Sequence, residues 1–144
     1  MSWYPKNKVL VPVDFSEASM KAVDVGLDFV SDPSGLYVLH VSRELNPNDP
    51  AVLWGNMDDN KRVEESKKAL REALGEPKYQ NIHVETLLGE PGSKIVKYAK
   101  GIGAELIIMP SHGRKGFEHM VIGSVAERVL RTAECPVLIL RRGK

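Results

Sequence analysis

The residues of this 144-residue chain that are best suited to chemistry lie in one segment, M-P-S-H-G-R-K-G-F-E-H-M-V-I-G-S-V, from Met109 to Val125. An apolar run precedes the segment and a helical pattern follows it, so we expect a strand end, a glycine-containing loop and a helix start. Glycine lets the backbone turn with positive φ and lets a ligand approach the main chain closely. A helix N-terminus offers unpaired N–H groups and partial positive charge, which suit phosphate. The segment therefore predicts an anion site.

The expected anion site draws its donors mainly from the main chain. The expected phosphate donors are the backbone N–H groups of Gly113, Gly123, Ser124 and Val125, with the Ser124 hydroxyl beside them. The side chains of Arg114 and Lys115 are also suited to meet phosphate oxygens. Because the glycine spacing is neither the Walker pattern nor the Rossmann fingerprint, a second interpretation stays open. In that interpretation the glycines serve turns only, and the basic residues form a solvated loop tip.

A second candidate group is the Asp14 carboxylate, which follows the apolar run of residues 9–13. A carboxylate at the end of a buried strand must find hydrogen-bond donors or water. Asp14 could therefore bind a ribose or a base, or help to hold a metal ion. Alternatively, it only caps the helix that begins near Ser16. The residue pattern leaves both interpretations open.

The histidines and serines do not predict a catalytic site. The spacing of His40, His83, His112 and His119 matches no common metal-ligand pattern. His112 lies in the loop, where it either contacts a ligand or is an ordinary exposed histidine. Ser111 precedes it directly, but adjacent residues rarely reach the geometry of a nucleophile and its base, and the chain has no nucleophile elbow. We therefore assign no catalytic residue.

Apolar runs and helical patterns alternate along the chain and must position these groups. The expected strands are residues 9–13, 36–41, 82–86, 106–109 and 137–140. The expected helices are residues 17–30, residues 61–74, a segment that includes residues 95–102 and a segment that begins at Ser124. Ser16 and Ser124 are the expected N-caps of the first and last helix, the latter in a capping box with Glu127. Pro12 cannot donate to a ladder and is tolerable only near the end of its strand.

This alternation predicts an α/β fold, a parallel sheet with helices on both faces and right-handed crossovers. Residues 82–86 alternate between apolar and polar side chains, which indicates an edge strand. Ligands of such sheets bind at the carboxyl ends of the strands, where the strand order reverses. If strands 9–13 and 106–109 are neighbours, Asp14 and the glycine loop face each other there.

Length and composition are those of a single globular domain, residues 1–144. The net charge of +1 argues against a nucleic-acid-binding stripe or a membrane-surface helix. The single cysteine, Cys135, fits a reducing compartment. No apolar segment approaches the roughly 20 residues of a membrane span, and none before Val9 resembles a signal peptide. We expect a cytoplasmic protein.

Several motifs can be compared with known families. They are V-L-V-P-V-D-F-S at residues 9–16, L-H-V at 39–41, G-E-P at 89–91, P-S-H-G at 110–113, G-S-V-A-E-R-V at 123–129 and C-P-V-L-I-L at 135–140. Together they resemble the universal stress protein family over essentially the whole chain. The family pattern is a glycine, two residues, a second glycine, nine residues, and then Gly-Ser or Gly-Thr. Here Gly113 is followed after nine residues by Gly123 and Ser124.

The resemblance implies a five-stranded parallel sheet in the order 3-2-1-4-5, with helices on both faces. It also implies a homodimer that pairs through the last strand, formed by Val137, Leu138, Ile139 and Leu140. Members with the glycine pattern bind ATP, often with Mg²⁺, whereas another branch lacks the pattern and does not. The expected function is that of an ATP-binding, dimeric stress-response regulatory factor. The alternatives are a nucleotide-free dimeric interaction module and a slow ATPase.

Carried over by position, the resemblance also implies where the nucleotide lies. Pro12, Val13 and Asp14 would lie by the adenine and ribose, and Val41 would contact the base. The phosphates would bind at Gly113, Gly123, Ser124 and Val125, next to Arg114. The complete expected nucleotide-binding set is Pro12, Val13, Asp14, Val41, Met109, Pro110, Ser111, His112, Gly113, Arg114, Gly123, Ser124 and Val125, and Asp14 is also the expected metal ligand.

The sequence departs from the family pattern at Pro110, which stands where the first glycine is expected. Proline fixes φ and removes an N–H group. If the nucleotide approaches the main chain closely here, proline would crowd it. If only the carbonyl or the local shape matters, ATP can still bind. The loss of one hydrogen bond of about 1–1.5 kcal/mol would weaken the affinity roughly tenfold.

Overall fold

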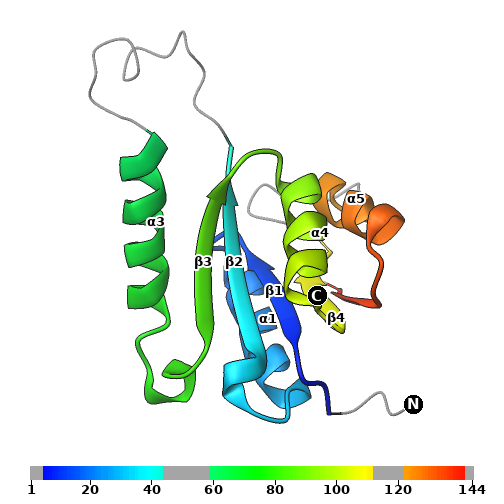
Figure 1. Ribbon diagram of the computed structural model, residues 1–144, viewed down its shortest axis with the longest axis horizontal. Coiled ribbons are helices and arrows are strands. Elements are labelled where there is room, and N and C mark those ends of the chain that lie inside the picture. Colours follow the sequence, from blue (N-terminus) through cyan, green and yellow to red (C-terminus); the bar gives the residue numbers. More distant parts are fainter. Residues whose placement is uncertain (1–4, 44–58, 112–121, 142–144) are drawn as a thin grey trace, which may run out of the picture.

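The computed structural model describes residues 5–43, 59–111 and 122–141. Its five strands form one parallel sheet in the order β3-β2-β1-β4-β5, which confirms the predicted topology (Figure 1). The strands are β1 (Val9–Val13), β2 (Leu36–Ser42), β3 (His83–Leu88), β4 (Leu106–Pro110) and β5 (Val137–Leu140). The central strands β1 and β4 are buried along their whole length, and β3 is an edge strand, as its alternating pattern predicted.

The helices lie on both faces of this sheet, again as predicted, with small shifts at their ends. They are α1 (Glu17–Phe29), α3 (Asp59–Ala73), α4 (Pro91–Ile102) and α5 (Ser124–Thr132), with short 3₁₀ turns η1 (Pro33–Gly35) and η2 (Pro77–Tyr79). Figure 1 shows α3 on one side of the strands and α4 and α5 on the other. Helix α1 packs on the same face as α3, because both contribute buried residues to the same half of the core. Within the described part of the chain, no helix is long and apolar enough to span a membrane.

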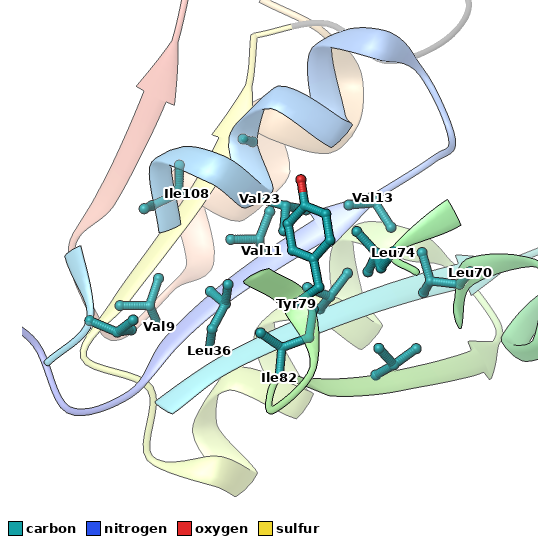
Figure 2. Close-up of a cluster of buried hydrophobic side chains, with 14 of the residues drawn as sticks. Val9, Val11, Val13, Val23, Leu36, Leu70, Leu74, Tyr79, Ile82 and Ile108 are labelled. Carbon is teal, nitrogen blue, oxygen red and sulfur yellow. The ribbon is translucent and has the colours of Figure 1, made fainter. Parts of the chain in front are cut away.

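The core has two halves, because successive side chains of a strand point to opposite faces of the sheet. Val9, Val11 and Val13 of β1 pack with residues of α1 and α3, including Val23 and Leu70 (Figure 2). These side chains are at most 5% exposed. The sheet is therefore covered on this face, as its continuous apolar runs predicted.

The second half of the core seats α4 and α5. Leu10 of β1 and Ile107 of β4 are fully buried there against Ile95 of α4 and Val129 of α5. This packing against the two central strands holds α5 in place over the sheet. This matters because the start of α5 contains three of the predicted site residues.

The first helix begins as its sequence predicted. The Ser16 side chain accepts a hydrogen bond from the Ser19 N–H at 3.1 Å, and Glu17 lies in the first turn of α1. Both features stabilise a helix N-terminus. The connection from β1 into α1 is therefore fixed by local hydrogen bonds.

Candidate functional site

β1 and β4 are neighbouring parallel strands, which confirms the adjacency on which the predicted site depended. Val9 is paired with Leu106 and Leu10 with Ile107. The strand order reverses at this pair, since β2 and β3 follow on one side and β5 on the other. Asp14 and Ser111 directly follow these two strands. Both residues therefore lie at the carboxyl ends of the strands, at the switch point of the sheet.

The ladder between β1 and β4 ends early, and two prolines explain why. The Ile107 N–H donates to the Pro136 carbonyl at 3.0 Å, so Ile107 faces β5 and its even-numbered neighbours face β1. At the observed register, the next two donors between β1 and β4 would be the nitrogens of Pro12 and Pro110. Neither nitrogen carries a hydrogen. The pairing with β4 accordingly stops at Leu10, whereas β1 stays paired with β2 as far as Val13.

This arrangement shows what a proline at position 110, where the family pattern has a glycine, does to the sheet. Pro110 is the last residue of β4, is buried, and is in register with Leu140 of β5. Its missing N–H would face the Pro12 carbonyl of β1 and not the start of α5. Proline at this position therefore removes a rung of the sheet, and the expected loss of a ligand donor does not follow.

The N-terminus of α5 is tied directly to the end of β4. The Gly123 N–H donates to the Ser111 carbonyl at 2.6 Å, and the Ser111 N–H donates to the Leu140 carbonyl at 3.0 Å. Ser111 itself is only 4% exposed. The Gly123 N–H, predicted as a phosphate donor, thus serves to join the helix to the sheet.

The prediction that Ser124 is the N-cap of α5 is wrong. Gly123 is the N-cap, with φ −74° and ψ 162°, and Ser124 is the first helical residue. Glu127 forms an ion pair with Arg131 at 3.0 Å in place of the predicted capping box. Because glycine has no side chain, it cannot cap the N–H groups of the first turn. The first hydrogen bond of the helix runs from the Glu127 N–H to the Gly123 carbonyl at 2.9 Å, so the N–H groups of residues 124–126 precede it.

Asp14 holds the turn between β1 and α1 and does not itself cap the helix, whose N-cap is Ser16. Its Oδ1 accepts a hydrogen bond from the Ser16 N–H at 3.0 Å, and its own N–H donates to Ser19 Oγ at 3.2 Å. The carboxylate is half-buried at the carboxyl end of β1. Phe15, which follows it, has φ 66°, a left-handed conformation that is rare for a non-glycine residue. The turn after β1 is thus held in a specific and costly conformation.

The main chain of Val41 also lies at the carboxyl ends of the strands. The Gly89 N–H donates to the Ser42 carbonyl at 2.9 Å, so Ser42 faces β3 and Val41 faces β1. Because β1 ends at Val13, opposite His40, the Val41 carbonyl faces the space beyond the end of that strand. A carbonyl in this position is an acceptor for an amino group.

His40 is a residue of this edge that the sequence analysis did not select. Its Nδ1 lies 2.9 Å from the Val13 carbonyl oxygen, and its Nε2 lies 3.2 Å from Ser42 Oγ. Its ring meets the Phe15 ring edge-on, with 4.8 Å between the centroids. The only signal in the sequence was a polar residue within the apolar run of residues 36–41.

The remaining predicted site residues divide into two groups. Met109 is buried in β4 and Val125 is half-buried in the first turn of α5, both at the edge described above. His112, Gly113 and Arg114, together with Lys115, lie outside the described residues. Among residues 5–43, 59–111 and 122–141, no group of three or more His, Cys, Asp or Glu side chains is arranged to hold a metal ion.

Glu90 connects the two helices on this face of the sheet. Its carboxylate accepts hydrogen bonds from the Gly92 N–H at 3.2 Å and the Ser93 N–H at 2.7 Å, which makes it the N-cap of α4. It also faces Arg128 of α5, with 3.7 Å between Oε2 and Nε. The Ser93 N–H is the main reason why the pKa of Glu90 lies below its usual value of 4.5.

We expect Glu90→Ala to lower the free energy of unfolding by about 1 kcal/mol at pH 7, because two N–H groups lose their acceptor. A carboxylate whose folded pKa is depressed stabilises the fold above its unfolded pKa and loses this contribution as the pH falls through the folded value. The difference between wild type and variant should therefore shrink below pH 4.5. Urea denaturation at several pH values measures this effect, with Glu90→Gln as the control that keeps an acceptor. A difference that is constant down to about pH 3 would contradict the assignment.

Comparison with known proteins agrees with this architecture. Residues 6–141 match the sequence profile of the universal stress protein family. The chain is 33% identical over 144 residues to universal stress protein MJ0531 of Methanocaldococcus jannaschii, covering 96% of this chain and 84% of that protein. The solved structure of MJ0577 from the same organism is similar with a TM-score of 0.79 at 30% identity, covering 96% of this chain and 98% of that one. A universal stress protein solved in complex with cAMP has the same fold, with a TM-score of 0.60 at 23% identity and coverage of 96% and 98%.

Proposed function

The chain belongs to the universal stress protein family, and we propose that it binds an adenine nucleotide, ATP, at the carboxyl ends of β1 and β4. One observation carries this proposal. The N-terminus of α5 is joined to the end of β4 through Gly123 and Ser111, beside the point where β1 and β4 separate. A helix N-terminus at the switch point of a parallel sheet is a common location for a phosphate-containing ligand. With this ligand the protein acts as a dimeric stress-response regulatory factor.

The phosphates bind at the first turn of α5 in this proposal. The N–H groups of Ser124 and Val125 precede the first hydrogen bond of the helix, and the partial positive charge of the helix end attracts anions. The Ser124 side chain is exposed and can add its hydroxyl as a donor. Gly113, Arg114 and His112 are proposed as further contacts from the preceding loop.

The base binds at the ends of β1 and β2. The Val41 carbonyl faces past the end of β1 and suits an exocyclic amino group, which adenine has and which guanine replaces at that position with a carbonyl. Pro12 and Val13 are buried beside it and provide the apolar edge of the site. The complex of a universal stress protein with cAMP, itself an adenine nucleotide, supports this choice of base.

A magnesium ion would accompany the phosphates of ATP. Proteins usually hold Mg²⁺ through one or two carboxylates together with phosphate oxygens and water. Asp14 is the proposed protein ligand, because its carboxylate is half-buried at the same strand ends and each carboxylate has several acceptor positions.

The proposed dimer forms through β5. This strand is the last of the sheet, and its four residues Val137–Leu140 are all apolar and only half-buried within one chain. An apolar edge strand is a template for pairing with another chain. In the opposite edge strand, β3, the polar residues His83 and Glu85 alternate with other side chains, so this strand fits the role less well. A reducing, cytoplasmic setting fits the single Cys135 thiol, which is not in a disulfide.

Pro110→Gly should change the Kd for ATP by less than about threefold, because the restored N–H faces Pro12 and not α5. Pro110→Ala provides the matched control, since it also restores the N–H but keeps a Cβ atom. Calorimetric titration of both variants with ATP measures the effect. If glycine alone tightened binding about tenfold, close approach of the ligand to the main chain would limit the affinity, contrary to our account.

Calorimetric titration of the wild-type protein with ATP tests the proposed function, with and without Mg²⁺. We expect micromolar binding at about one site per chain and weaker binding of GTP, whose O6 would oppose the Val41 carbonyl. Absence of binding up to millimolar ATP would overturn the proposal. The chain would then belong with the nucleotide-free interaction modules.

A further inference from the structure

Three contacts of His40 join the ends of β1 and β2. On β1, its Nδ1 lies 2.9 Å from the Val13 carbonyl oxygen. A carbonyl can only accept, so this nitrogen carries the hydrogen. On its own strand, Nε2 lies 3.2 Å from Ser42 Oγ, and in the neutral ring this nitrogen accepts the hydroxyl hydrogen. The half-buried ring therefore uses both nitrogens within the protein.

The third contact acts on the turn that follows β1. The Phe15 ring meets the His40 ring at an interplanar angle of 64°, with 4.8 Å between the centroids. Phe15 has φ 66°, and a non-glycine residue keeps such a conformation only when its surroundings hold it there. The packing against His40 is one of those restraints.

The residues in these contacts lie directly before and after two residues that we propose to contact the nucleotide. Asp14 lies between Val13 and Phe15, both of which touch His40. Val41 lies between His40 and Ser42, which are joined to each other. We propose that His40 is a positioning residue for nucleotide binding: by joining Val13, Phe15 and Ser42, it sets the relative orientation of the Asp14 carboxylate and the Val41 carbonyl.

This inference rests on the proposed function, and it adds a residue that does not itself touch the ligand. A ligand binds more tightly to protein groups that neighbouring residues already hold in place, because those groups lose less conformational freedom on binding. His40 should therefore affect the affinity for ATP more than it affects the fold.

The test compares three substitutions of His40 by calorimetric titration with ATP. Asparagine places an amide N–H close to the position of Nδ1, so His40→Asn should bind ATP within about threefold of wild type. His40→Leu lacks the donor, and His40→Gln carries the same amide one methylene further out. Both should weaken binding by about tenfold. His83→Leu is the matched control, because this histidine stacks on Tyr37 at the start of the edge strand β3.

The outcomes separate the inference from the proposed function. If wild type does not bind ATP, the proposed function fails. If wild type binds and all three His40 variants bind equally well, or if Asn is as weak as Leu and Gln, then His40 is not a positioning residue acting through its Nδ1 donor. Thermal unfolding of the ligand-free variants identifies any that fail to fold. The comparison of Asn with Gln keeps the test decisive if His40→Leu is one of them.

Discussion

Ser124→Pro is expected to weaken ATP binding by about ten- to a hundredfold, because it removes one N–H donor to a charged phosphate. Ser124 is the first residue of α5, a position at which proline is well tolerated because its fixed φ matches the helix. The residue before proline must be extended, and Gly123 already has φ −74° and ψ 162°. The substitution therefore removes the donor without breaking the helix.

Ser124→Ala is the matched control, since it removes the hydroxyl and keeps the backbone N–H. It should weaken binding by no more than about tenfold, and circular dichroism should report intact helices for both variants. If proline and alanine reduced the affinity equally, the hydroxyl would be the contact and the main chain would not. If neither reduced it, the phosphates would bind elsewhere.

Ile108→Ala is expected to lower the free energy of unfolding by about 2–5 kcal/mol. Ile108 is fully buried in the central strand β4, within the cluster that α1 and α3 cover (Figure 2). The substitution removes apolar contacts and leaves a cavity that the closely packed side chains around it cannot collapse to fill. Urea denaturation of wild type and variant gives the difference.

Leu130→Ala controls for the loss of a large apolar side chain. Leu130 of α5 is 46% exposed, so its removal should change the free energy of unfolding by less than about 0.5 kcal/mol. Equal effects of the two substitutions would contradict the assignment of β4 to the centre of the core.

The sequence predicted the architecture well, for a physical reason. Apolar runs such as residues 9–13 and 106–109 are continuous because these strands are covered on both faces, and the 82–86 run alternates because it lies at an edge. Hydrophobic periodicity reports burial, so it locates elements of this kind. The start of α5 was misjudged by one residue, since Ser124 suits an N-cap in isolation but the Gly123–Ser111 hydrogen bond makes Gly123 the cap.

The site was less predictable, because its features depend on which strands are neighbours. Pro12 and Pro110 are separated by most of the chain, and only the register of β1 with β4 reveals that both remove donors from the same ladder. The contacts of His40 with Val13 and Phe15 likewise need the pairing of β1 with β2. The roles of Gly113 and Arg114 in the loop stay predictions.

The most direct test of the central claim is to titrate ¹⁵N-labelled protein with ATP and with adenosine and to follow the backbone amide resonances. Our account predicts that ATP shifts the amides of Asp14, Val41, Ser124 and Val125. Adenosine should shift those of Asp14 and Val41 but not those at the start of α5. Gly35 and Gly103, which precede β2 and β4 at the opposite end of the sheet, should be unaffected by either ligand. Shifts confined to that opposite end, or no shifts at millimolar ATP, would contradict the account.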